Sequence, residues 1–182
     1  MFWKRLSLML ILVMVSFNTS IYLTLPYYQK LNDLFEPVKF EDPLQTKITV
    51  ISSYFRISRE LSRLIVEVAQ DEGIDPYFFA ALLYTESRFN PKAVSPKGYK
   101  GLGQIPWDIP YVKSQLVVSA EIYKEKYRIA QDPFLATRLY KGFPSWSPKA
   151  REHVRRVFVV KNSLHHYERL LSRELRDQYG KS

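Results

Sequence analysis

The sequence contains no cysteine and only 6 glycines among its 182 residues, although it contains 11 prolines. The lack of cysteine excludes disulfide bonds, a cysteine nucleophile, a thiolate metal site and a lipid-modified N-terminal cysteine. Few glycines and many prolines favour helices joined by proline-containing connections over an all-β sandwich. Because hydrophobic residues make up 46% of the chain, it can bury a core, and the length suits one domain with an appendage.

The chain contains fewer acidic than basic residues. It has 18 Asp and Glu and 27 Lys and Arg, so its net charge is +9. A positive surface attracts polyanions, and nucleic acid, anionic lipid and an acidic cell wall all fit this description. The excess is concentrated in residues 149–181, which hold nine basic and four acidic side chains. No recognised nucleic-acid module accompanies this segment, so we expect no nucleic-acid partner.

A long stretch without charged residues follows Lys4 and Arg5 near the N-terminus. Its residues 6–25 would span roughly 30 Å as a helix, which matches the hydrocarbon core of one membrane. The two basic residues favour a cytoplasmic N-terminus. Since no convincing small-residue cleavage site follows, we predict an uncleaved, single-pass signal anchor in the cytoplasmic membrane over residues 1–26. The rest of the chain would face the periplasm or the outside, with residues 27–56 as a stem.

From residue 57 onward, apolar residues recur with the period of a helix. Ser58 suits the N-cap of the first helix, and Gly73 suits its C-terminal stop. A second helix is expected to begin at Asp75 and Pro76, since aspartate caps helices and proline fits their first turn. It is expected to end just before the next proline, because the residue preceding a proline disfavours helical geometry.

Residues 90–110 contain three glycines and four prolines and are predicted to form a loop. The helical pattern then returns three times: over residues 112–129, from Asp132 to about Gly142, and after Pro148. We therefore predict one all-α domain over residues 57–160, followed by a basic helical extension over residues 161–182.

Glu86 is the one acidic residue of the second predicted helix after its cap. Leu82 and Leu83 lie four and three positions earlier and share its face. Glu86 also lies in the last turn, where the negative end of the helix dipole opposes a carboxylate. Both influences raise the pKa of a glutamate, as a general acid near neutral pH requires. From the helix alone, the alternative is that Glu86 faces solvent or pairs with a nearby cation such as Arg88.

The residues around Glu86 form a pattern of several elements at fixed spacing. In order they are Glu86-Ser87 at a helix end, the Asn90-Pro91 break, Ser95, Gly98, Gly101-Leu102 and Gln104. This pattern resembles the catalytic domain of the soluble lytic transglycosylase (SLT) family, which shares the lysozyme fold. Segments 139–142 and 153–157 also resemble the family and extend the likeness over about residues 56–160. The resemblance implies an all-α domain of the goose-type lysozyme and SLT kind, after one N-terminal transmembrane helix.

The resemblance also implies a reaction on peptidoglycan glycan strands. Glu86 would protonate the oxygen between N-acetylmuramic acid and N-acetylglucosamine and then take a proton from the muramyl C6 hydroxyl. That hydroxyl attacks C1 and closes a 1,6-anhydro ring, so the reaction needs no second carboxylate, no cofactor and no metal. By the same carry-over, the residues expected to bind substrate are Ser87, Ser95, Gln104, Tyr140 and Lys141.

Three positions depart from the family pattern. Gly103 stands where the family has methionine, Tyr99 replaces a small residue, and Lys141 replaces a common asparagine. An ammonium group close to Glu86 would lower the pKa of the carboxyl group, against its role as an acid. Tyr140 is expected to hydrogen-bond Glu86 or the transition state.

Other readings of the chain remain open. A hydrolytic muramidase of the same fold would need a base to position water, and Asp108 is the closest carboxylate downstream of the pattern. A catalytically silent wall-binding or scaffold protein is the alternative outside enzymes. Trp107 and Trp146 are candidates for sugar contact. Adjacent histidines on a helix point in different directions, so His165 and His166 cannot share a metal and are expected at the surface.

The resemblance also suggests partners. Small, membrane-tethered enzymes of this kind open the wall locally for secretion, conjugation or phage-assembly machinery, and the sequence does not choose among these.

Overall fold

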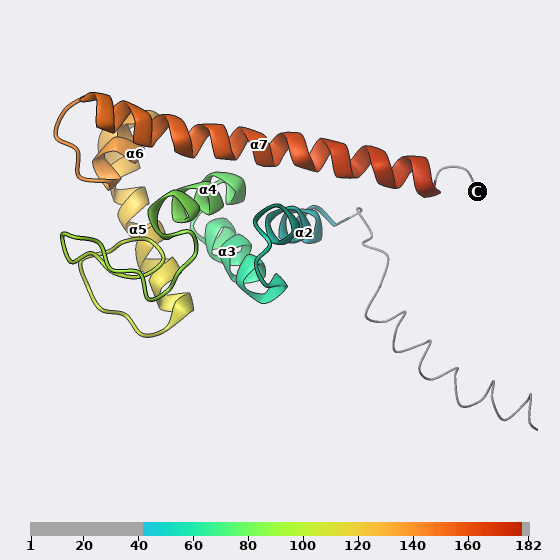
Figure 1. Cartoon of the computed structure of the whole chain (residues 1–182), viewed down its shortest axis with the longest axis horizontal. Helices are drawn as coiled ribbons and strands as arrows, with labels where there is room; N and C mark the ends of the chain where they lie inside the picture. Colours follow the sequence, from blue (N-terminus) through green and yellow to red (C-terminus); the bar gives the residue numbers. More distant parts are fainter. Residues whose placement is uncertain (1–41, 180–182) are drawn as a thin grey trace, which may run out of the picture. The chain divides into compact units, whose positions relative to one another are not determined.

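The computed structural model describes residues 42–179 of the chain (Figure 1). The signal anchor predicted over residues 1–26 and the first part of the predicted stem lie outside these described residues. Within the described part, none of the helices is both long and apolar enough to cross a membrane.

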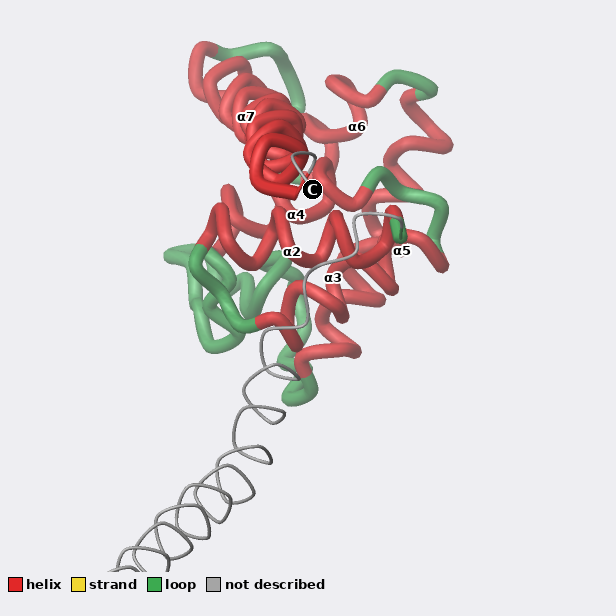
Figure 2. Tube along the Cα trace, turned by 90° about the vertical axis from the view of Figure 1, so that its right-hand side faces the viewer, coloured by secondary structure: helices red, strands yellow, loops and turns green. Residues whose placement is uncertain are grey.

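Helices account for all the regular elements of the described part, and Figure 2 shows only helices and loops there. The loop between α4 and α5 contains two isolated bridges, which pair Lys100 with Val94 and with Ile105. The expected all-α class is therefore confirmed for this part of the chain. The helices are α2 (Pro43–Phe55), α3 (Arg59–Asp71), α4 (Pro76–Ser87), α5 (Val112–Ala130), α6 (Pro133–Tyr140) and α7 (Pro148–Tyr179).

Side-chain caps fix the start of several helices. Asp42, Ser58, Asp75 and Asp132 each accept a hydrogen bond from a backbone N–H in the first turn of the following helix. A cap of this kind contributes about 1 kcal/mol. The predicted helix starts at the last three of these residues are confirmed. The predicted stop at Gly73 is confirmed as well, since its φ of 67° is a conformation that glycine adopts without strain.

Helix α4 lies at the centre of the core. Its residues from Pro76 to Leu83 are all buried, and Phe79 to Leu83 are 0% exposed. A helix that is apolar on every side is stable only when other elements surround it. Helices α2, α3 and α7 pack against α4, which fixes the position of its last turn.

Helix α6 connects α5 to α7 and packs against both. Its buried side is formed by Ala136 and Thr137, which are 0% exposed. As a result, the residues that follow α6 and those that begin α7 are held beside the end of the buried α4.

The limits of the domain differ from the predicted ones at both ends. Residues 43–55 of the predicted stem form α2, whose Ile48, Val50 and Ile51 are 0% exposed. These side chains alternate with polar ones at helical spacing, and they complete the core beside α3 and α7. At the other end α7 continues past residue 160, and Leu164 is 0% exposed. The first part of the predicted extension is therefore packed against the domain.

Candidate active site

Helix α4 ends in a tight turn directly after Ser87, the residue that follows Glu86. Arg88 and Phe89 have φ angles of 53° and 61°, which lie in the left-handed region. Each such residue costs roughly 1–2 kcal/mol when it is not glycine. The cost is offset by packing, because the ring of Phe89 is buried with its centroid 4.9 Å from that of Phe55. The turn leaves Glu86 in the last helical turn and sends the chain into the following loop.

The side chain of Glu86 is enclosed by residues from three segments. It is 1% exposed, and its Oε2 atom accepts a hydrogen bond from the ammonium group of Lys141, directly after α6. Its Oε1 atom lies 3.4 Å from Nε2 of His153, in the second turn of α7. The Lys141 side chain is 34% exposed and that of His153 is 9% exposed. The carboxyl group thus has an outer neighbour that is charged and an inner neighbour that is an imidazole.

Burial and charge act on Glu86 in opposite directions. Burial raises the pKa of the carboxyl group above its usual value, and the charge and hydrogen bond of Lys141 lower it in part, so the net pKa is raised. The pKa of His153 is lowered to about 4, first by burial and then by the charges of Lys141 and Arg156. At neutral pH the imidazole is therefore uncharged, and Lys141 is the cation in contact with Glu86.

Two buried polar atoms face each other at this site. Oε1 of Glu86 and Nε2 of His153 both lack a hydrogen-bond partner among the described residues, although only 3.4 Å separates them. A small rotation of either group would form the bond. A protonated Glu86 could donate a hydrogen bond to Nε2 of the tautomer that carries no proton on this atom. An ionised Glu86 could accept a hydrogen bond from Nε2–H of the other tautomer. His153 can therefore pair with both states that an acid–base group passes through.

The residues predicted to bind substrate take different positions. Lys141 contacts Glu86, as described. Ser87 donates to the carbonyl of Leu83 at 3.3 Å, and Ser95 accepts from the backbone N–H of Tyr99 at 3.1 Å. Gln104 donates to backbone carbonyls of the same loop, at 3.1 Å and 3.3 Å. These side chains shape the helix end and the loop, and their contacts with substrate stay predictions.

Tyr140 supports the loop and does not donate to Glu86. Its hydroxyl donates to the carbonyl of Gly103 at 2.8 Å. A Cβ atom on Gly103 would lie 1.9 Å from Oγ of Ser119 and 2.6 Å from the Tyr140 hydroxyl, so this position has no room for a side chain. The methionine expected from the family pattern is thus replaced by inward packing of Ser119 and Tyr140. The pKa of Tyr140 is raised, first by burial and then by the charge of Glu86.

The loop between α4 and α5 is fastened by a single side chain from α5. Gln115 is 4% exposed, accepts from the backbone N–H of Leu102 at 2.9 Å, and donates to the carbonyls of Pro91 and Ile109 at 3.1 Å and 2.7 Å. Gly101 permits this approach, because a Cβ atom there would lie 2.4 Å from Oε1 of Gln115.

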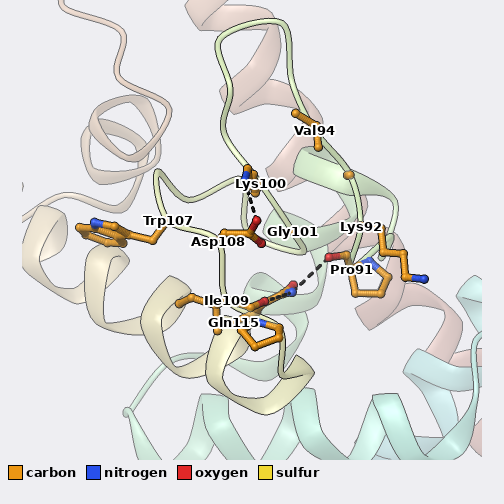
Figure 3. Close-up of a pocket in the computed structure, with 11 residues that line it drawn as sticks. Pro91, Lys92, Val94, Lys100, Gly101, Trp107, Asp108, Ile109 and Gln115 are labelled. Carbon is orange, nitrogen blue, oxygen red and sulfur yellow. Dashed lines mark hydrogen bonds and ion pairs between the residues drawn. The ribbon is translucent and has the colours of Figure 1, made fainter.

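A pocket of about 380 Å³ opens beside this fastened loop (Figure 3). Lys100 pairs with Asp108 at 2.6 Å across it, and Trp107 at its edge is 57% exposed. Glu86 is not among its lining residues. Trp146, the second predicted sugar contact, lies elsewhere, with the guanidinium of Arg138 5.1 Å from its ring centroid.

Three residues of the site were not predicted from the sequence: His153, Ser119 and Gln115. A signal for His153 was present, because it lies four positions before Val157 on the face that is buried in α7. Ser119 and Gln115 are polar residues four positions apart on one face of α5, next to the apolar Leu116 and Ala120. Their spacing predicts a shared face, but not which loop that face contacts.

These features define a helical domain built around one enclosed acidic side chain at a helix end. Residues 63–137 match the family model of the transglycosylase SLT domain, so the resemblance of the sequence to this family is confirmed over that segment. At the level of the family, the match supports an enzyme that cleaves glycosidic bonds, with peptidoglycan as its substrate. The matched segment contains Glu86 but ends before Lys141 and His153. The comparisons with curated proteins and with solved structures gave no match.

Proposed function

We propose that the chain is a peptidoglycan lytic transglycosylase and that Glu86 is its catalytic acid and base. The observation that carries this proposal is the enclosure of one glutamate at the end of α4, inside the segment that matches the SLT domain. Burial raises the pKa of this carboxyl group, which favours the protonated form that a general acid needs.

The reaction needs one carboxyl group in two successive roles. Protonated Glu86 gives its proton to the bridging oxygen, the bond from that oxygen to the muramyl C1 breaks, and the N-acetylglucosamine chain leaves with a free hydroxyl. Ionised Glu86 then takes the proton of the muramyl C6 hydroxyl as that oxygen bonds to C1. The reaction neither gains nor loses a proton, because Glu86 is protonated again when the anhydro ring has formed. His153 supports both stages, because a neutral imidazole can pair with either form of the carboxyl group.

Hydrolysis by the same domain is less well supported. The carboxylate considered as its base, Asp108, is 76% exposed and paired with Lys100. Within the described part, no contact orients it toward Glu86. Intramolecular attack avoids this requirement, since the substrate already holds its hydroxyl next to the reacting carbon.

One observation favours a second candidate, a wall-binding protein without catalysis. The ammonium group of Lys141 occupies Oε2 of Glu86, and an ionised carboxylate in an ion pair has no proton to give. A binding protein of this kind would sediment with the cell wall and release no fragments.

The proposal is tested by identifying the muropeptides that the protein releases from cell walls. The full chain and its Glu86→Gln variant are purified in detergent and incubated with isolated sacculi, and released muropeptides are analysed by mass spectrometry. Anhydro-muropeptides from the parent and none from the variant would support the proposal. Reducing-end muropeptides would replace it with hydrolysis. Sedimentation of both proteins with the wall, without release, would favour the binding protein.

We also propose that residues 1–26 anchor the chain in the cytoplasmic membrane, with the domain on the outer side. The uncharged stretch over residues 6–25 and the basic residues before it support this orientation. A C-terminal alkaline phosphatase fusion, which is active only outside the cytoplasm, would be active if the proposal holds. An inactive fusion, or a chain extracted from membranes by alkaline carbonate, would contradict it. We further propose that the anchored chain associates with machinery for secretion, conjugation or phage assembly.

A further inference from the structure

Lys141 covers the side of Glu86 that is nearer to solvent. Its ammonium group contacts Oε2, and its side chain is 34% exposed where that of Glu86 is 1% exposed. The other oxygen, Oε1, faces the imidazole of His153, whose side chain is only 9% exposed. A sugar arriving from solvent would therefore meet the lysine before it could meet the carboxyl group.

The backbone of Lys141 is held in place, whereas its side chain can move. Its N–H donates to the carbonyl of Thr137 at 3.3 Å, and Gly142 ends the turn with a φ of 74°. Thr137 is itself 0% exposed. The four-carbon side chain extends from this fixed point, and Glu86 is the only ion-pair partner that its ammonium group has among the described residues. Rotation of the side chain would move the charge away without moving the helix.

We propose that Lys141 holds Glu86 inactive until a carboxylate of the substrate draws the ammonium group away from Oε2. This inference rests on the proposed function and adds a requirement that the substrate must meet. Each muramyl unit carries a lactyl group whose carboxyl end is either free or joined to a peptide with its own carboxylates. A strand of N-acetylglucosamine alone carries neither. The contact would thus make an anionic group next to the reacting bond a condition for catalysis.

The groups around Glu86 explain why movement of the Lys141 ammonium group alone would raise the pKa of Glu86. The groups that face the carboxyl group are Lys141 after α6, the hydroxyl of Tyr140 at the end of α6, and His153 of α7, with Arg156 acting on His153. His153 has a pKa of about 4 and is uncharged at neutral pH. Without the Lys141 charge, the opposing influence on the carboxyl group is removed, so the pKa of Glu86 rises further and its protonated form is favoured.

The direct test follows the protonation of Glu86 by carbon NMR. The full chain is labelled at the glutamate carboxyl carbon, and the resonance that is missing in Glu86→Gln is assigned to Glu86. The probes are two disaccharides without the scissile bond, GlcNAc–MurNAc with its lactyl carboxylate and neutral diacetylchitobiose. We expect GlcNAc–MurNAc to shift the titration midpoint of Glu86 upward and diacetylchitobiose to leave it unchanged. A third probe, GlcNAc–MurNAc joined to an alanyl-isoglutamine dipeptide, keeps only a peptide carboxylate and identifies which carboxylate acts.

Variants of Lys141 make the test specific. The Lys141→Met variant keeps an unbranched side chain without the charge. In this variant the titration midpoint of Glu86 should be higher than in the parent before any disaccharide is added, and it should not change when one is added. Lys141→Arg should retain the response, since it keeps the charge. If GlcNAc–MurNAc fails to bind, or binds and leaves the Glu86 midpoint unchanged, the inference is wrong.

Turnover separates this inference from the proposed function. If the parent cleaves wall strands and Lys141→Met has the same pH profile and the same preference over chitin oligomers, the inference fails and the function stands. If the Glu86 resonance responds as expected but no product forms, the function fails and the contact stands. We expect Lys141→Met to extend activity to higher pH and to reduce the preference for muramyl-containing strands.

Discussion

The loop after α4 and the cluster formed by Glu86, Lys141 and His153 are held together in different ways. Within the loop, Ser95, Gln104 and the Lys100–Ile105 bridge bond to backbone a few residues away. Glu86, by contrast, contacts Lys141 and His153, which lie 55 and 67 positions later in the chain.

The two regions also differ in how completely their polar groups are paired. The loop uses the amide of Gln115 as both donor and acceptor, whereas the cluster leaves Oε1 of Glu86 and Nε2 of His153 without a hydrogen bond. Full pairing stabilises a shape, and incomplete pairing leaves a carboxyl group free to change its protonation state. We therefore expect substitutions in the loop to affect mainly stability and those in the cluster to affect mainly turnover and pH dependence.

The largest effect is expected from Glu86→Gln. Loss of the acid and base should reduce turnover of sacculi by at least about 10²–10⁴-fold, the usual contribution of a positioned acid–base group. The melting temperature should stay near that of the parent, because the amide keeps the shape of the side chain. Product release is followed by chromatography of soluble muropeptides, with the exposed Glu121→Gln on α5 as control. Near-parent turnover of Glu86→Gln would remove the glutamate from the mechanism.

Among the residues that hold the loop, Gln115 of α5 should have the largest effect on stability when it is replaced in Gln115→Ala. The substitution removes three hydrogen bonds and leaves the buried N–H of Leu102 unpaired, so the free energy of unfolding should fall by about 2–4 kcal/mol. Urea denaturation measures this change. Gln70→Ala, at an exposed position of α3, should change it by less than about 0.5 kcal/mol. Equal values for the two variants would show that Gln115 does not fasten the loop.

His153→Phe should change how stability depends on pH. The pKa of His153 is about 4 in the folded chain, and an unfolded histidine has a pKa of about 6.5. Between these values the unfolded chain binds a proton here that the folded chain does not, so this residue destabilises the fold as pH falls from about 6.5 to 4. The variant should lose this dependence, on the order of 2 kcal/mol across the interval.

Urea denaturation at several pH values across that interval measures the slope. His166→Phe, at an exposed position of α7, is the control and should keep the slope of the parent. A slope that stays unchanged in His153→Phe would mean that the imidazole is protonated as easily in the folded chain as in the unfolded one.

The smallest effect is expected from Tyr140→Phe. The variant loses the hydroxyl group that donates to the carbonyl of Gly103 and is also hydrogen-bonded with Ser119, so the free energy of unfolding should fall by about 1 kcal/mol. Thermal unfolding measures this, with Tyr111→Phe as the control because Tyr111 is 73% exposed. A loss of turnover much greater than the loss of stability would indicate that the hydroxyl also acts on the substrate.

The difference between local and long-range contacts explains which parts of the structure could be predicted from the sequence. Helix starts at Ser58, Asp75 and Asp132 follow from bonds that span two or three residues, so the local sequence contains all the necessary information. The loop follows from its glycines and prolines, and the pattern around Glu86 predicted the family. The enclosure of Glu86 was favoured by Leu82 and Leu83, which share its buried helix.

Contacts between distant segments were harder to predict. The sequence predicted that Lys141 would matter if it came close to Glu86, but not that it would do so. His153 was not predicted to face Glu86, although the helical spacing to Val157 placed it on a buried face. Residues 43–55 of the predicted stem proved to be α2, because their apolar side chains complete a core formed by later helices. Such outcomes depend on which faces meet, and this is decided by the packing of the whole domain.

The close packing at Gly103 limits how this sequence can change over evolutionary time. Ser119 fills the space above Gly103 and is fixed by its own bond to the carbonyl of Gln115 at 2.6 Å. A methionine at position 103 would collide with Ser119 and the Tyr140 hydroxyl while both side chains remain. A lineage could acquire a larger side chain at position 103 only after a smaller residue had appeared at position 119 and the ring at position 140 had moved. The order of substitutions is thus constrained, and we expect related sequences to vary at positions 103, 119 and 140 together.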